Sequence, residues 1–364
     1  MEYFFEDVLE IINGKNQKVV ENPNGKYPIY GSGGIMGYAD DYICNADTII
    51  IGRKGSINNP IYVSEPFWNV DTAFGLYANK ELLNPRYLYY FCNNFDFERL
   101  NKTVTIPSLT KSDLLKIKID VPELYVQENV VHVLTRIVSI INLHQKELEY
   151  FDTLIKARFV EMFGTLHDNE KSFKVVTVDD VCTLIKDGTH QTPQYTEDRQ
   201  RGFKFLSSKD VMSQKIDWTD IKYIPQELHE KLYATIKPQR NDILMSKNGV
   251  NYGVAAVNDT DEVFDIYVSL ALLRPKNSID PVFLRCAINS PETKTQFDSS
   301  IKGIGVPNLH LGEIKKTKIF LPPMEIQKEF VLFVEQVDKS KVVVQKALDE
   351  TQTLFDSLMQ EYFG

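Results

Sequence analysis

Two stretches of the sequence carry apolar residues at alternating steps of four and three, the spacing of a coiled-coil heptad. The first seam is Val130, Leu134, Ile137, Ile141, Leu148, Phe151 and Ile155, and the second is Phe330, Val334, Val337, Val344, Leu348, Phe355 and Leu358. Polar residues interrupt each seam, at His144 and Arg158 and at Lys341 and Thr351. The pattern predicts two long helices, each about 60 Å long at about 1.5 Å per residue.

The two helical stretches belong to an internal repeat. Residues 106–164 align with residues 306–364 without a gap, and the copies end in Glu-Met-Phe-Gly and Glu-Tyr-Phe-Gly. Neither apolar seam can remain in water, so each needs a partner. A homodimeric coiled coil is one solution, but duplication within one chain favours pairing of the two seams with each other.

The segments before the helices resemble one another more weakly and in the same order. Residues 6–12 match 179–185, residues 49–55 match 243–249, and residues 68–70 match 264–266. Short apolar runs between Gly, Pro and Asn predict α+β heads that are rich in strands and have long loops. We therefore divide the chain into a first head (1–122), a central helix (123–164), a linker (165–172), a second head (173–322) and a C-terminal helix (323–364).

Charge and cysteine content restrict the possible functions. The net charge is −9, but the two heads carry only −3 and +1. Such a chain should bind duplex DNA weakly alone and depend on a partner for electrostatic attraction. The four cysteines form no CxxC pair, which indicates reduced thiols in a cytoplasmic protein and no metal site. We find neither a secretion signal nor a membrane-spanning run.

Sequence motifs for catalysis are missing. The glycine-rich stretch 31–37 is not GxGxxG and lacks the Gly-Lys-Ser/Thr ending of a phosphate loop. Asn59-Pro60-Ile61 and Asp280-Pro281-Val282 do not fit the Asn/Asp-Pro-Pro-aromatic motif of adenine methyltransferases. Glu313-Ile314-Lys315 could be read as part of a nuclease motif, but the other copy has no lysine there. We predict no catalytic residue, no metal site and no cofactor bound by this chain.

Polar residues at matched positions favour recognition of DNA instead. Arg53-Lys54 and Lys247-Asn248 follow equivalent apolar runs, and these side-chain types can contact guanine, adenine or phosphate. An ordinary solvated loop residue is the alternative for each one; their repetition in both copies favours the set. The predicted DNA-binding residues are Tyr30, Ser32, Gly33, Arg53, Lys54, Ser56, Lys102, Thr189, His190, Gln191, Lys209, Ser246, Lys247, Asn248 and Lys302.

Together these features resemble the specificity subunit of Type I restriction-modification systems. The resemblance covers essentially the whole chain and is carried by the head–helix–head–helix order and by loose motifs. The motifs are Tyr27–Tyr38, Ile51–Ser56, Asp187–His190 and the junctions at 307–309 and 321–323, although Val121-Pro122-Glu123 departs from the last pattern.

This resemblance implies that each head reads one half of a split, asymmetric DNA target. The two helices would pair antiparallel, set the unread spacer and dock two methyltransferase subunits. Those subunits would carry S-adenosylmethionine and methylate adenine N6, and two restriction subunits using ATP and Mg²⁺ could join them. The rival hypotheses are a duplicated coiled-coil scaffold that does not read DNA, which the acidic charge favours, and a fused restriction enzyme with its own active site.

Overall fold

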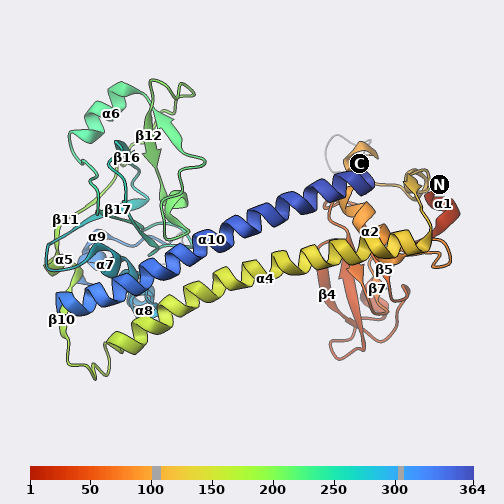
Figure 1. Ribbon diagram of the computed structural model, residues 1–364, viewed down its shortest axis with the longest axis horizontal. Helices are drawn as coiled ribbons and strands as arrows, with labels where there is room; N and C mark the ends of the chain where they lie inside the picture. Colours follow the sequence, from red (N-terminus) through yellow and green to blue (C-terminus); the bar gives the residue numbers. More distant parts are fainter. Residues whose placement is uncertain (101–107, 302–306) are drawn as a thin grey trace. The chain divides into compact units, whose positions relative to one another are not determined.

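The computed structural model describes residues 1–100, 108–301 and 307–364 (Figure 1). By its contacts the chain divides into two units. Unit 1 consists of Met1–Glu147 and Val344–Gly364, and unit 2 consists of Leu148–Val343. Each unit therefore contains one head together with a portion of each long helix.

Unit 1 contains three small sheets. The four-stranded sheet has the order β2-β8-β5-β6, the three-stranded sheet has the order β4-β3-β7, and β1 pairs with β9. The strands are β1 (Glu2–Phe4), β2 (Leu9–Asn13), β3 (Tyr27–Gly31), β4 (Gly34–Ala39), β5 (Thr48–Gly52), β6 (Ile61–Val63), β7 (Trp68–Asn69), β8 (Ala73–Ala78) and β9 (Lys118–Asp120). The short helices are α1 (Phe5–Val8), α2 (Pro85–Asn94) and α3 (Lys111–Leu114), with 3-10 turns at Gln17–Val19 and Phe97–Leu100.

Unit 2 repeats this plan with the sheet orders β11-β17-β14-β15, β13-β12-β16 and β10-β18. Its strands are β10 (Lys174–Thr177), β11 (Cys182–Asp187), β12 (Phe203–Leu206), β13 (Lys222–Ile224), β14 (Ile243–Ser246), β15 (Ala255–Val257), β16 (Phe264–Ile266), β17 (Leu270–Pro275) and β18 (Lys318–Leu321). Its short helices are α5 (Val178–Val181), α6 (Gln226–Tyr233), α7 (Pro281–Ile288), α8 (Pro291–Ser300) and α9 (Leu311–Lys316), with a 3-10 turn at Ser208–Val211. Every sheet of one head therefore has its counterpart in the other, which confirms the predicted α+β fold with an internal repeat.

Backbone pairing corrects two details of the predicted alignment. Ile11 pairs with Leu76, and Ile185 pairs with the equivalent Leu273, because β11 has an irregularity between Cys182 and Leu184. Residues 10–12 therefore match 184–186 rather than 183–185.

The second detail concerns β7 and β16. Val70 N donates to Tyr30 O at 3.0 Å, and Tyr267 N donates to Leu206 O at 2.8 Å. Val70 is therefore equivalent to Tyr267, and residues 68–70 match 265–267 rather than 264–266. Trp68 and Phe264 are both aromatic, but the equivalence of strand positions is set by the hydrogen-bond register.

The predicted long helices are α4 (Leu124–Phe163) and α10 (Met324–Phe363), each of 40 residues. In unit 2 the Phe159 and Phe330 rings lie 5.5 Å apart. There Asp152 pairs with Lys341 and Arg158 with Glu329. As the residue numbers rise along α4, those of the partners on α10 fall, so these segments are antiparallel.

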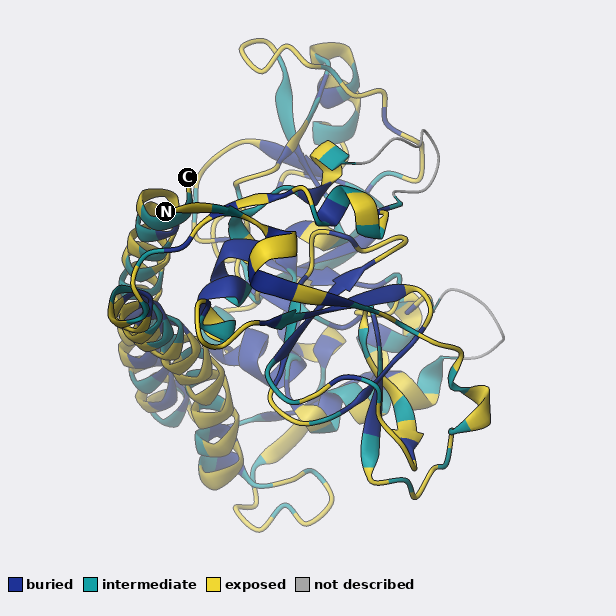
Figure 2. Cartoon of the chain, turned by 90° about the vertical axis from the view of Figure 1, so that its right-hand side faces the viewer, coloured by how far each residue is buried: buried dark blue, intermediate teal, exposed yellow. Residues whose placement is uncertain are grey.

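Unit 1 contains the other ends of these two helices, the start of α4 and the end of α10. Val130 and Leu134 of α4 share an apolar core with Met359 of α10. Every residue of the two predicted seams is buried or partly buried, whereas the intervening positions include exposed ones (Figure 2). Apolar burial along the seam is therefore the main force holding the segments together.

A buried glutamine fixes the start of each long helix to its head. Gln127 accepts from Asn84 N at 2.8 Å and donates to the carbonyl oxygens of Leu82 and Pro122. Gln327 accepts from Asp280 N at 2.8 Å and donates to the carbonyl oxygens of Ser278 and Pro322. Both side chains are fully buried, and these bonds satisfy their polar atoms. Head and helix thus form one packed structure in each unit.

The described residues contain no helix long and apolar enough to cross a membrane. All four cysteines are buried and unpaired. In Cys44, Cys92 and Cys182 burial raises the pKa of the thiol, which keeps it in the unreactive protonated form.

Candidate nucleic-acid interface

In the first head, the carboxyl ends of β2, β3, β5 and β7 meet at one edge. Backbone hydrogen bonds tie the loops that follow these strands together. Lys15 N donates to Asn69 O at 2.8 Å, Arg53 N to Thr72 O at 2.8 Å, and Val70 N to Tyr30 O at 3.0 Å. We call the set of loops 14–16, 32–33, 53–57 and 70–72 the first loop edge. These hydrogen bonds join the loops through main-chain atoms, so they do not depend on which side chains the loops carry.

The second head has the same edge after β11, β12, β14 and β16. Thr189 N donates to Ile266 O at 3.1 Å, Lys247 N to Ser269 O at 2.9 Å, and Tyr267 N to Leu206 O at 2.8 Å. The loops 188–191, 207–209, 247–250 and 267–269 form this second loop edge. Each hydrogen bond has its counterpart in the first loop edge, so the two edges share one backbone framework.

A glycine is required at the same place in both edges. A Cβ on Gly14 would lie 1.8 Å from Val70 O, and a Cβ on Gly188 would lie 2.1 Å from Ile266 O. Only glycine allows the strand to pass so close to the neighbouring loop. Gly188 lies within the predicted motif Asp187–His190, whereas Gly14 and the exposed Lys15 after it are not among the predicted residues. Superposing the Asp187-Gly188-Thr189 motif on Asn13-Gly14-Lys15 would have found them.

Predicted residues of the first head gather at the first loop edge. Arg53 and Lys54 are exposed, and neither forms an ion pair with any residue that the structure describes. The Arg53 guanidinium lies over the Phe74 ring at 5.7 Å, which orients its donors. Lys15 is also exposed and has no ion-pair partner in the described ranges. The edge therefore presents cationic groups that are available to a ligand.

The remaining predicted residues of the first head lie next to these cations. A Cβ on Gly52 would meet Ser56 O at 2.2 Å and Ser32 Cβ at 3.0 Å, so the two turns touch at this glycine. Gly33 has open space around it, with no heavy atom within 4 Å of a Cβ placed there. Burial raises the pKa of Tyr30, so its hydroxyl stays protonated. This part of the edge offers hydroxyl groups and bare backbone.

The second loop edge holds its cations in ion pairs. The Lys247 side chain is only 5% exposed, and its Nζ donates to Asp187 Oδ2 at 2.9 Å. His190 Nε2 lies 3.3 Å from the same carboxylate oxygen. Burial by itself raises the pKa of Asp187, but the hydrogen bond and charge of Lys247, with the charge of His190, lower it overall. Asp187 therefore stays ionised and neutralises much of the local positive charge.

Other predicted residues of the second head also have partners within the chain. Ser246 is buried; its Oγ donates to Asn251 O at 2.8 Å and accepts from Val254 N at 3.0 Å. Lys209 Nζ donates to Asp220 Oδ2 at 2.7 Å. Ser246 and Lys247 thus stabilise the edge from within, and their role in DNA contact stays a prediction.

Exposed polar groups remain at the second loop edge. Gln191 and His190 are exposed, and Thr189 is partly exposed. Asn248 is partly buried, and its Oδ1 has no hydrogen-bond partner among the described residues. Lys102 and Lys302 lie outside the described residues. Thr189, Gln191 and Asn248 therefore give the second loop edge neutral donors and acceptors where the first offers cations.

The described residues hold no group of three or more His, Cys, Asp or Glu side chains that could hold a metal ion. The loop edges contain hydroxyl, amide and cationic groups around exposed backbone. This arrangement is suited to binding the edges of bases and phosphates.

Comparison with known proteins identifies the family. The family model described as "Type I restriction modification DNA specificity domain" matches residues 1–150 and 170–351. The chain therefore belongs to this family, and the resemblance drawn from the sequence is confirmed. The two matched segments correspond to the two copies of the repeat.

Named relatives agree with this assignment. The EcoBI specificity subunit of a Type I restriction enzyme from Escherichia coli is 24% identical over 371 residues, covering 93% of this chain and 77% of that protein. The MjaVIII specificity subunit from Methanocaldococcus jannaschii is 22% identical over 383 residues, covering 97% and 89%. These relatives are named specificity subunits, which confirms the prediction that this chain is a non-catalytic specificity subunit.

Solved structures share the fold. The Type I restriction-modification S subunit from M. genitalium has a TM-score of 0.58 at 16% identity, with 100% of this chain and 96% of that chain covered. A chain from a study of complex assembly and conformational transition in a Type I system gives a TM-score of 0.59 at 16% identity, covering 100% and 97%.

Proposed function

We propose that this chain is the DNA-reading subunit of a Type I restriction-modification enzyme, and that each loop edge reads one half of a two-part site. The observation that carries the proposal is the pair of loop edges. They share one set of backbone hydrogen bonds but present different side chains. Two readers built on one framework with different contact groups suit an asymmetric target.

The chemistry of each edge suits different contacts. Arg53 and Lys54 can bind guanine O6 and N7 or backbone phosphates. Gln191 and Asn248 carry amides, which can pair with adenine N6 and N7. The first loop edge should therefore contribute more of the salt-dependent binding energy, and the second should contribute relatively more through neutral hydrogen bonds.

Partners complete the proposed enzyme. With a net charge of −9, the chain is poorly suited to hold duplex DNA alone. Two methyltransferase subunits would dock on the long helices, supply basic surface, carry S-adenosylmethionine and methylate adenine N6. Restriction subunits using ATP and Mg²⁺ could join in the cytoplasm. This chain would bind no cofactor itself.

A head exchange tests the two-reader proposal. The chain is expressed with its methyltransferase partner, and the methylated motif is found by sequencing genomic DNA for N6-methyladenine. Replacing residues 1–122 by the matching head of another family member should change one half of the motif and leave the other half and the spacer unchanged. A motif in which both halves change would reject independent readers, and the absence of any two-part motif would reject the proposal.

A helix insertion tests the proposed spacer function. Adding one turn to each of α4 and α10, about 5.4 Å along the axis, should change the unread spacer and preserve both half-sites. Insertion into α4 alone breaks the pairing of the seams and serves as the disrupted control. Unchanged spacer length in a folded double insertion would contradict this role of the helices.

A further inference from the structure

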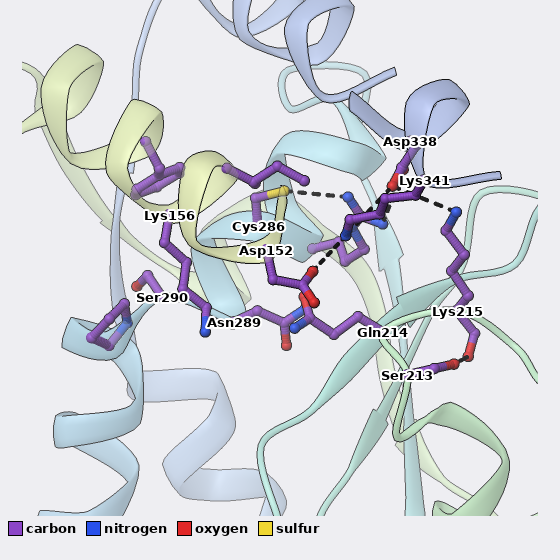
Figure 3. Close-up of a pocket in the computed structure, with 14 residues that line it drawn as sticks. Asp152, Lys156, Ser213, Gln214, Lys215, Cys286, Asn289, Ser290, Asp338 and Lys341 are labelled. Atoms are coloured by element: carbon purple, nitrogen blue, oxygen red, sulfur yellow. Dashed lines mark hydrogen bonds and ion pairs between the residues drawn. The ribbon is translucent and has the colours of Figure 1, made fainter. Parts of the chain in front are cut away.

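Unit 2 contains a pocket with several charged lining residues, none of which belongs to its loop edge. It lies where α4, α10, α7 and the loop at 213–215 come together (Figure 3). Its charged lining residues are Asp152, Lys156, Lys215, Arg285, Asp338 and Lys341. Figure 3 shows the side chains of Asp152 and Lys341 directed toward one another across the pocket.

Positive charge exceeds negative charge in this lining. The Asp338 carboxylate lies 3.5 Å from Lys215, 3.9 Å from Arg285 and 4.0 Å from Lys341. The Asp338 carboxylate is thus shared by three cations. Asp152 supplies the other carboxylate of the lining. Lys156 adds a further cation that has no ion-pair partner within the described part of the chain. Arg285 is the buried cation of this set, whereas Lys156 is exposed and Lys215 is half exposed, so the lining carries a net positive charge that favours an anion.

Arg285 has hydrogen-bond donors to spare. Only 7% of the residue is exposed. Its Nε is buried and has no partner among the described residues. Its Nη2 makes only a long contact of 3.5 Å to Cys286 Sγ. A guanidinium carries five N–H donors, so an oxygen ligand would satisfy groups that the protein leaves unpaired.

The equivalent place in unit 1 is filled by aromatic side chains. The N-caps Asn84 and Asp280 match, which places Tyr89 and Tyr90 of α2 where α7 has Arg285 and Cys286. Tyr90 packs on Phe355 at 6.5 Å, and its hydroxyl lies 3.1 Å from Thr135 Oγ1. The repeated fold can therefore close this place with rings, and the charged pocket is a special feature of unit 2.

We propose that this pocket binds the oxyanion group, a carboxylate or a phosphate, of a small molecule. Arg285 and Lys215 would donate to its oxygens. The cavity volume of about 30 Å³ corresponds to about two water molecules. This is room for one anionic group, with the rest of the ligand directed into solvent.

Calorimetric titration of the full chain with inorganic phosphate and with acetate, against sodium chloride of equal ionic strength, tests the proposal. Either phosphate or acetate should bind, with one site per chain. Arg285→Gln and Lys215→Gln should each weaken it about tenfold, the effect of one lost charge-assisted hydrogen bond. Lys215 is half exposed, so its variant should fold even if the Arg285 variant does not. Lys328→Gln, an exposed lysine of α10, is the matched control and should have no effect.

Asp338→Asn reverses the sign of the test. It removes a carboxylate that competes for the same cations, so anion binding should become several-fold tighter. Binding of phosphate alone identifies a phosphate ligand, and binding of acetate alone identifies a carboxylate. The proposal is overturned if neither anion binds beyond the chloride control, or if Lys328→Gln weakens binding as much as Lys215→Gln. Either result leaves the DNA-reading proposal untouched, because no lining residue of the pocket belongs to the loop edge.

Discussion

The two loop edges share one backbone framework but differ in how their cations are held. In the first, Arg53 and Lys54 have no ion-pair partner among the described residues. In the second, Lys247 occupies the position of Arg53 but is buried against Asp187. Hydrogen bonds and glycines thus set the shared framework, whereas a few side chains that differ between the two heads set the contact chemistry.

The glycines of the shared framework should be the most sensitive positions. Gly14→Ala places a Cβ 1.8 Å from Val70 O, and Gly188→Ala places one 2.1 Å from Ile266 O. We expect each to lower the free energy of unfolding by about 2–4 kcal/mol, because the neighbouring backbone has to shift. Urea unfolding measures this.

Gly33→Ala is the matched control for the framework glycines, since no heavy atom lies within 4 Å of its Cβ position. It should change stability by less than about 0.5 kcal/mol. Equal losses at Gly14 and Gly33 would show that close backbone contact is not what holds the edge.

Breaking the ion pair of the second loop edge should have the next largest effect on the free energy of unfolding. Lys247→Met leaves the Asp187 carboxylate without its closest cation. The expected loss is about 1–3 kcal/mol, since the carboxylate retains some exposure to water. Arg53→Met in the first loop edge breaks no ion pair between described residues and should cost less.

The same pair predicts a pH dependence. The pKa of Asp187 is lowered in the folded chain, so its stabilisation is present above the unfolded value of about 3.9. It should disappear as the pH falls through the lower folded value. Urea unfolding between pH 7 and pH 2.5 should show this acid loss in the parent chain and less of it in Asp187→Asn. An identical acid profile in both chains would contradict the assignment.

Effects on DNA binding should be smaller per residue and confined to one head. Arg53→Ala and Lys54→Ala should each reduce the slope of log K against log salt by about 0.9 if the side chain contacts a phosphate. Lys247→Met should leave this slope unchanged, because its charge is already neutralised. Lys118→Ala, on β9 and paired with Glu2, controls for general loss of charge. A slope that changes only with Lys118 would place the phosphate contacts elsewhere.

The two long helices could be predicted from the sequence because their apolar pattern is regular. The heptad steps from Val130 to Ile155 and the ungapped match of the two tails predicted α4 and α10. The fold class followed from the repeat and the short apolar runs. The equivalence of Asn69 and Ile266 in the two heads could not be predicted from the sequence. It depends on hydrogen bonds to strands far away in the chain.

The candidate site was only partly readable. Arg53-Lys54 and Lys247-Asn248 were placed at equivalent positions, and the structure agrees on that equivalence. The burial of Lys247 was hidden because its partner Asp187 lies 60 residues earlier. Gly14 was missed since the need for glycine arises from Val70, on another loop. Contacts between distant segments are what a single sequence reveals least.

The independence of the two loop edges is tested most directly by the methylated motif of edge variants. Residues 53–56 of the first loop edge and residues 189–191 of the second are replaced separately in the chain expressed with its methyltransferase partner. We predict that each replacement alters or abolishes recognition of one half-site, a different half for each, while the other half and the spacer persist. A folded, assembled variant that changes both half-sites, or two variants that change the same half, would contradict the account.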